Sequence, residues 1–139
     1  QLSTRKYAPM KFMLAVLGDP LHCQGPITAY RFAEAAVTAG HTIHRVFFYQ
    51  GAVLVANDLA EPPQDETSIT ELWQRLASEN SIELVACIAS ASRRGIFDED
   101  EAVRYQKPTS SISSGFIIGG LGQLLEGILV ADKTVTFGS

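Results

Sequence analysis

The sequence predicts a single α/β domain with three layers, in which helices cover both faces of an open, mostly parallel sheet. Short, continuous apolar runs that stop at glycine, proline or polar residues are typical of buried parallel strands. Segments in which apolar residues recur at helical spacing lie between these runs, and this alternation indicates a parallel sheet. The chain has 139 residues, which is the length of one ordinary domain.

The first half of the chain is expected to form a strand, a helix, a second strand and a short helical turn. Residues 12–17 are apolar and stop at a Gly-Asp-Pro sequence, which predicts a central strand. Residues 27–39 have helical spacing and end at a glycine. Residues 42–49 are rich in β-branched and aromatic side chains and predict the second strand. A short helical turn over 51–56 and an exposed, irregular loop over 57–65 follow, since the loop contains two consecutive prolines.

The second half repeats this alternation. A helix that starts near residue 67 or 68 presents apolar residues on one face and leads into a third strand over 82–89. The acidic run 98–101 suits the positive end of a helix dipole, so we interpret it as a solvated helix start rather than as a catalytic or metal-binding cluster. The remaining expected elements are an apolar segment over 116–118 that leads into a helix through 121–129, and a last short strand over 133–137.

Composition limits the classes of function. The formal net charge is −4 and the pI is near 5.3, which argues against a nucleic-acid surface. The two cysteines fit neither a disulfide framework nor a zinc site, and no stretch reaches the ~18 apolar residues of a membrane span. We therefore expect a cytoplasmic protein without metal or cofactor, with its domain over residues 10–139. Residues 1–9 are expected to be an N-terminal extension, either an expression remnant or a disordered segment, with the natural start at Met10.

Cys87 is the most informative residue. It ends the apolar run of the third predicted strand, and Arg93 and Arg94 follow closely. Ligands bind at the carboxyl ends of strands in open α/β sheets, so the thiol is expected at the mouth of a site. The arginines and the backbone N–H groups of the following turn favour the thiolate, which is the reactive form of cysteine. We infer supporting roles for the two arginines, and for Ser90 and Ser92 as hydrogen-bond donors, from their proximity in the sequence alone.

Two other interpretations of this segment stay open. The spacing from Cys87 to Arg93 is that of a cysteine phosphatase, whose loop wraps backbone N–H groups and an arginine around a phosphate. The intervening residues contain no glycine to let such a loop curl, and Arg94 replaces the usual Ser or Thr. The cysteine could also be structural in a scaffold subunit. His22 and Cys23 lie in a loop expected to face Cys87, and their contribution is left open.

Several stretches of the chain share a pattern with one known family: residues 10–12, 47–51, 57, 84–95, 119–126 and 131–135. In these stretches the chain resembles the DsrE/TusD sulfur-relay family, and it looks closer to the DsrE branch. The resemblance extends over residues 10–138, and the stretch from Cys87 through Arg93-Arg94-Gly95 is its most specific part. It implies a DsrE-like version of the flavodoxin-like fold.

The resemblance also implies a function. Members of the family carry sulfur as a persulfide on a strand-end cysteine, which matches Cys87. They work as hetero-hexamers of related subunits (DsrF/DsrH-like or TusC/TusB-like), take sulfur from a TusA-like carrier and pass it to a DsrC/TusE-like acceptor. The resemblance implies a cysteine that is exposed for carrier docking, and apolar surface buried between subunits. We look for that surface in the helix 121–129 and in the aromatic residues 47–49. Sulfur oxidation and transfer-RNA thiolation both remain open as pathways.

Overall fold

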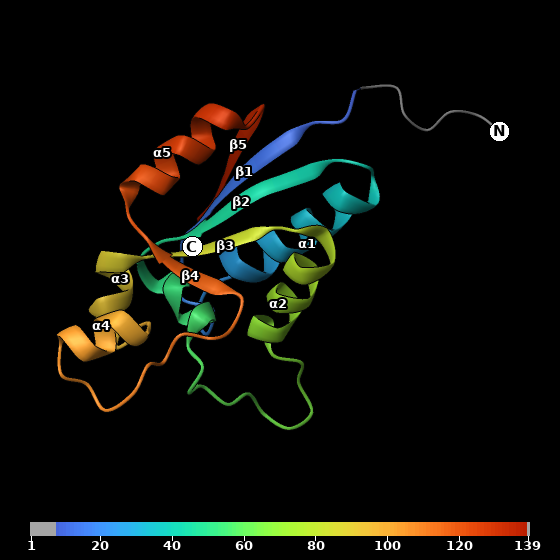
Figure 1. Cartoon of the computed structure of the whole chain (residues 1–139). Coiled ribbons are helices and arrows are strands. Elements are labelled where there is room, and N and C mark those ends of the chain that lie inside the picture. Colours follow the sequence, from blue (N-terminus) through green and yellow to red (C-terminus); the bar gives the residue numbers. More distant parts are fainter. Residues whose placement is uncertain (1–7, 139) are drawn as a thin grey trace.

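The computed structural model describes residues 8–138, and its centre is a five-stranded sheet with the order β4-β3-β2-β1-β5 (Figure 1). Each neighbouring pair is parallel, so the predicted sheet is confirmed. Most of the expected extension, residues 1–7, lies outside the described residues. The strands are β1 (Lys11–Val16), β2 (Thr42–Phe48), β3 (Glu83–Cys87), β4 (Phe116–Gly119) and β5 (Lys133–Phe137).

Helices cover both faces of the sheet, which confirms the three layers (Figure 1). On one face, α1 (Gly25–Thr38) packs beside α2 (Ile69–Asn80), and α5 (Leu121–Val130) lies on the other face. Three short helices lie near the carboxyl ends of the strands: the 3₁₀ helix η1 (Gln50–Ala56), α3 (Ile88–Ser92) and α4 (Glu99–Arg104). No helix in residues 8–138 is long and apolar enough to span a membrane.

Two elements differ from the sequence prediction. The expected strand over 82–89 ends at Cys87, because the chain turns there into α3 and leaves the apolar Ile88 40% exposed. Residues 116–118 were expected only to lead into a helix, but 116–119 form the separate edge strand β4. A strand of four residues that ends in the first glycine of a glycine pair is too short to show a periodicity of its own.

The aromatic residues at the end of β2 belong to the core. Phe47 and Phe48 are fully buried, and the ring of Phe48 contacts Trp73 of α2 edge to face, with the centroids 5.5 Å apart. The expectation that these two residues add surface for a partner is therefore wrong. Their burial follows from their position on a central strand between two helical layers.

Candidate functional site

An open cavity of about 760 Å³ lies at the carboxyl ends of the strands. Residues that follow each of the five strands contribute to its wall, as expected for ligand sites in open parallel sheets. The lining residues are Leu17, Gly18, Tyr49, Gln50, Gly51, Cys87, Ala89, Ser90, Arg93, Arg94, Leu121 and Gly138.

Cys87 lies in the wall of this cavity as the last residue of β3, directly opposite Gly119 of β4 in the strand register. The residue is buried and only 4% exposed. The implied exposure for carrier docking is therefore wrong for this structure. The cysteine comes to the cavity because β3 ends there, but the neighbouring strand and helix leave little of it accessible.

Ser90 lines the cavity, and its hydroxyl also makes a contact that the sequence did not predict. Its side chain is buried, and its Oγ accepts a hydrogen bond from the Gln50 backbone N–H at 2.9 Å. Gln50 has a φ of 52°, in the left-handed region that non-glycine residues rarely adopt. Ser90 therefore joins the turn after β2 to the helix after Cys87 and stabilises an unusual backbone conformation.

The two arginines are placed as predicted, and Ser92 is not. Arg93 and Arg94 are exposed and line the cavity, and the Arg94 guanidinium donates to the Ser90 carbonyl oxygen at 3.0 Å. Ser92 is absent from the lining, and its Oγ donates to the Ala89 carbonyl oxygen at 3.3 Å. The cavity thus combines one thiol with two cations.

The segment between Cys87 and Arg93 is a turn of helix and not a phosphate-binding loop. The Arg93 N–H donates to the Ala89 carbonyl at 3.4 Å, and the Arg94 N–H donates to the Ala91 carbonyl at 3.0 Å. The backbone N–H groups of Arg93 and Arg94 therefore already have carbonyl partners in the chain. A phosphatase loop instead directs its backbone N–H groups towards one bound anion. The geometry therefore does not favour the phosphatase interpretation.

The segment after β1 lines the cavity through Leu17 and Gly18. Its Asp19 carboxylate contacts the His22 ring at 3.1 Å, and the hydrogen bonds from the Leu21 backbone N–H and from His22 keep the pKa of Asp19 below its usual value. Neither His22 nor Cys23 lines the cavity. Within residues 8–138, no group of three or more His, Cys, Asp or Glu residues could hold a metal ion.

Sequence reasoning missed eight of the twelve lining residues: Leu17, Gly18, Tyr49, Gln50, Gly51, Ala89, Leu121 and Gly138. The signal that could have found them is positional. In a parallel sheet, the residues just after each strand meet at the same edge, so the first residues after β2 and β5 belong beside Cys87 whatever their chemistry.

Comparison with known proteins agrees with this geometry. Residues 10–137 match the DsrE/DsrF-like family. DsrE of Allochromatium vinosum is 45% identical over 93% of this chain and 99% of its own length. Sulfurtransferase TusD of Yersinia pestis is 41% identical, and a sulfurtransferase TusD homolog of Vibrio parahaemolyticus is 40% identical, each over 92% of this chain and 98% of the relative.

A solved structure shares the fold. The crystal structure of the ychN protein from E. coli superposes with a TM-score of 0.73 at 21% identity, covering 92% of this chain and 99% of the other. The match over nearly the whole domain, together with relatives above 40% identity, settles the family. The chain belongs to the DsrE/DsrF-like family.

Proposed function

We propose that this chain is a sulfurtransferase that carries sulfur as a persulfide on Cys87. One observation carries the proposal: Cys87 is the cysteine that lines the cavity at the strand ends, and two arginines line the same cavity. The similarity to proteins named as TusD sulfurtransferases supports the reaction class.

The reaction consists of two thiol exchanges without net oxidation. The Cys87 thiolate attacks the terminal sulfur of a donor persulfide, so that a new S–S bond forms on Cys87 and the donor leaves as a thiolate. An acceptor thiolate then attacks the terminal sulfur on Cys87. The S–S bond on Cys87 breaks, the acceptor becomes the persulfide, and Cys87 is again a thiolate.

Arg93 and Arg94 support both anions in this cycle. Each places a guanidinium on the cavity wall, where a positive charge stabilises the attacking thiolate and the persulfide anion. Ser90 acts through the backbone, because its Oγ holds Gln50 in position beside the cavity. We assign no role in the chemistry to Ser92.

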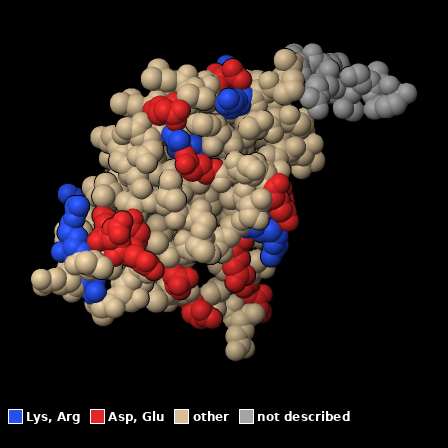
Figure 2. All heavy atoms as spheres, viewed as in Figure 1, with Lys and Arg blue, Asp and Glu red and all other residues tan. Residues whose placement is uncertain are grey.

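We also propose that the chain works with partners. The exposed surface of α5 is apolar: Leu121 and Leu125 are each 60% exposed and Leu129 is 84% exposed. Figure 2 shows few charged side chains over this helix, and an apolar helix face is usually covered in an assembly. The proposed assembly is a hetero-hexamer of paralogous subunits in the cytoplasm, with a TusA-like donor and a DsrC/TusE-like acceptor.

Sulfur loading tests the function. The full chain is incubated with polysulfide, and its intact mass and peptide map are measured beside Cys87→Ser and Cys23→Ser variants. We expect the wild type and Cys23→Ser to gain the mass of one sulfur atom on the peptide that contains Cys87. Loading of Cys87→Ser to the level of the wild type would contradict the proposal.

A further inference from the structure

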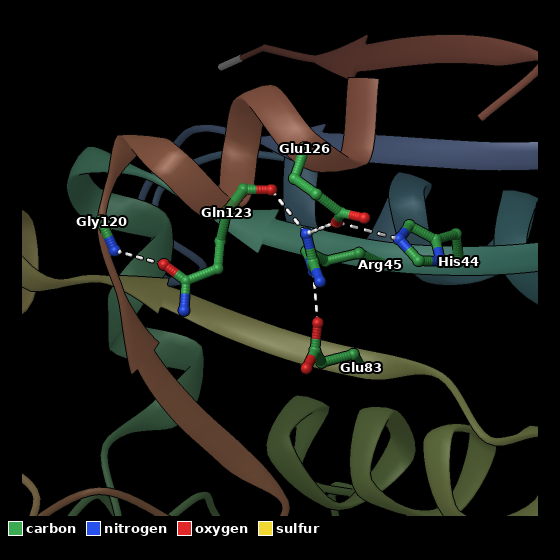
Figure 3. Close-up of polar contacts among 6 residues, drawn as sticks. All are labelled: His44, Arg45, Glu83, Gly120, Gln123 and Glu126. Atoms are coloured by element: carbon green, nitrogen blue, oxygen red, sulfur yellow. Dashed lines mark hydrogen bonds and ion pairs between the residues drawn. The ribbon is translucent and has the colours of Figure 1, made fainter. Parts of the chain in front are cut away.

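An ionic network around a buried arginine lies on the α5 side of the sheet (Figure 3). Its centre is Arg45 of β2, which is buried and contacts three groups. The guanidinium donates to the Glu83 carboxylate of β3, to the Glu126 carboxylate of α5 at 2.6 Å and to the Gln123 carbonyl oxygen of α5 at 2.6 Å. One side chain thus joins the central strands to the helix above them.

An irregularity in β2 brings two consecutive basic side chains to the same helix. Phe12 pairs with Ile43 and Met13 pairs with Arg45, so His44 is an extra residue in the register. A β-bulge of this kind redirects side chains. Arg45 and His44 both reach Glu126, and the His44 ring nitrogen lies 3.4 Å from its carboxylate oxygen.

The charges of this network favour its ionised form. Burial lowers the pKa of Arg45, but hydrogen bonds from its guanidinium to Glu83 and Glu126 outweigh burial and raise it. Hydrogen bonds from Arg45 and His44 lower the pKa of Glu126. Since both shifts favour the charged forms, the pair is ionised at neutral pH.

The network continues from Arg45 to the cavity. Gln123 accepts from Arg45 through its backbone, and its Oε1 accepts from the Gly120 N–H at 2.9 Å (Figure 3). Gly120 follows Gly119, which lies opposite Cys87 in the strand register, and precedes Leu121, which lines the cavity. Two hydrogen bonds, from Arg45 to Gln123 and from Gly120 to Gln123, therefore connect the buried arginine to the cavity wall beside the cysteine.

Few apolar side chains of α5 pack against the sheet beside these polar contacts. Gly127 is the only buried residue of α5, where the helix comes so close to Met13 that a Cβ on Gly127 would lie 2.4 Å from the Met13 sulfur. Leu124 is partly buried, whereas Leu121, Leu125 and Leu129 point away from the core. Apart from Leu124 and Gly127, the attachment of this helix to the sheet is therefore largely polar, through the contacts of Arg45 with Gln123 and Glu126.

We propose that Arg45 is a positioning residue, which holds the first turn of α5 over the strand ends through Gln123 and Glu126 and thereby controls access to Cys87. The inference rests on the proposed function, because access matters for a thiol that must meet the thiols of other proteins. Release of this attachment would let Gly120 and Leu121, which follow the strand-paired Gly119, move away from the buried cysteine.

Two variants separate positioning from general stability. Glu126→Gln weakens the link between Arg45 and the helix, and Glu83→Gln, the matched control, weakens a link of the same arginine within the sheet. The rates of alkylation of Cys87 and Cys23 by iodoacetamide are measured by peptide mapping of the full chain. We expect Glu126→Gln to accelerate alkylation of Cys87 by roughly three- to fivefold, the scale of one lost, partly exposed charged hydrogen bond, with Cys23 unchanged.

The same experiment can overturn the inference. An unchanged rate at Cys87 in Glu126→Gln would contradict it, as would an equal acceleration in Glu83→Gln or an equal acceleration at Cys23. If Glu126→Gln does not fold, Glu126→Asp, which keeps the charge but draws the carboxylate back from Arg45, is expected to give the same selective acceleration, and its failure would also refute the inference. Since alkylation requires no sulfur donor, this outcome is independent of whether Cys87 carries a persulfide.

Discussion

At the scale of single residues, Cys87 is both buried and part of a cavity wall. It lines this cavity together with two exposed arginines, Arg93 and Arg94. The proposed role of the arginines, which is to stabilise an anionic sulfur on Cys87, can be tested by removing one of them.

Arg93→Ala should slow alkylation of Cys87 at neutral pH by roughly three- to tenfold without unfolding the chain, because a positive charge in the same cavity wall is proposed to stabilise the anionic sulfur that reacts. The matched control is Arg75→Ala, which removes an exposed arginine of α2 outside the cavity. The measurement is the pH profile of alkylation between pH 6 and pH 9. Identical profiles for the two variants would show that Arg93 does not act on the thiol.

Glu101 has an environment that the sequence did not indicate. The acidic run does begin a helix, since the Asp98 carboxylate caps α4 by accepting from the Glu101 N–H at 2.9 Å. Glu101 itself is only 6% exposed, and among the described residues neither carboxylate oxygen has a hydrogen-bond partner. Burial, with a contribution from the Asp98 charge, raises the pKa of Glu101 above its ordinary value.

This shift predicts a pH dependence of stability. The folded chain holds the Glu101 proton more tightly than the unfolded chain, so the resulting stability is complete below the unfolded pKa and is lost as pH rises through the folded pKa. At pH 8, Glu101→Gln should increase the free energy of unfolding by about 1–2 kcal/mol and flatten its pH dependence. Urea unfolding at several pH values checks this. The control is Glu99→Gln, an exposed acid in the same helical turn, and the same gain in both variants would contradict the explanation.

At the scale of elements, the junction between β4 and α5 is closely packed. A Cβ on Gly119 would lie 2.6 Å from Val85 Cγ1 and 2.9 Å from Gln123 Cδ, which is closer than real contacts allow. Gly122, one turn further along, has nothing within 4 Å of such a Cβ. A side chain is therefore excluded at Gly119 by lack of space, whereas the space at Gly122 would accept one.

Gly119→Ala and Gly122→Ala should have opposite effects on stability. The first forces the strand or Gln123 to move and should lower the free energy of unfolding by about 1–3 kcal/mol. The second adds a better helix former at an open position and should raise it by up to about 1 kcal/mol. Urea unfolding measures both, and a Gly119→Ala variant as stable as the wild type would show that the junction is not constrained.

At the scale of the whole molecule, the outer face of α5 predicts association. Leu125→Glu places a charge in the centre of this face and should weaken binding to co-expressed paralogous subunits by at least about tenfold. Val103→Glu, which changes an exposed apolar residue of α4, serves as the control. Sedimentation of the co-purified proteins checks this. Equal loss of the complex in both variants, or in neither, would show that α5 is not the interface.

The layers, the parallel sheet and the strand-end position of Cys87 could be predicted from the sequence, because apolar periodicity and glycine or proline stops are local signals. The edge strand β4 was missed because it is four residues long. The contacts of Arg45 with Gln123 and Glu126 could not be predicted, because these residues lie 78 and 81 positions from Arg45 and meet it only in the folded chain. The burial of Cys87 likewise depends on the strand and helix that pack beside it. Local patterns carry no information about such distant contacts.

Transfer of sulfur from Cys87 to a second thiol tests the central claim most directly. The chain is first loaded with sulfur, freed from the donor and mixed with a small acceptor protein that contains one accessible cysteine, and both intact masses are followed in time. The account predicts that the chain loses one sulfur atom as the acceptor gains one, and that Cys87→Ser neither loads nor transfers. Sulfur that stays on the loaded chain, or transfer that continues in Cys87→Ser, would contradict it.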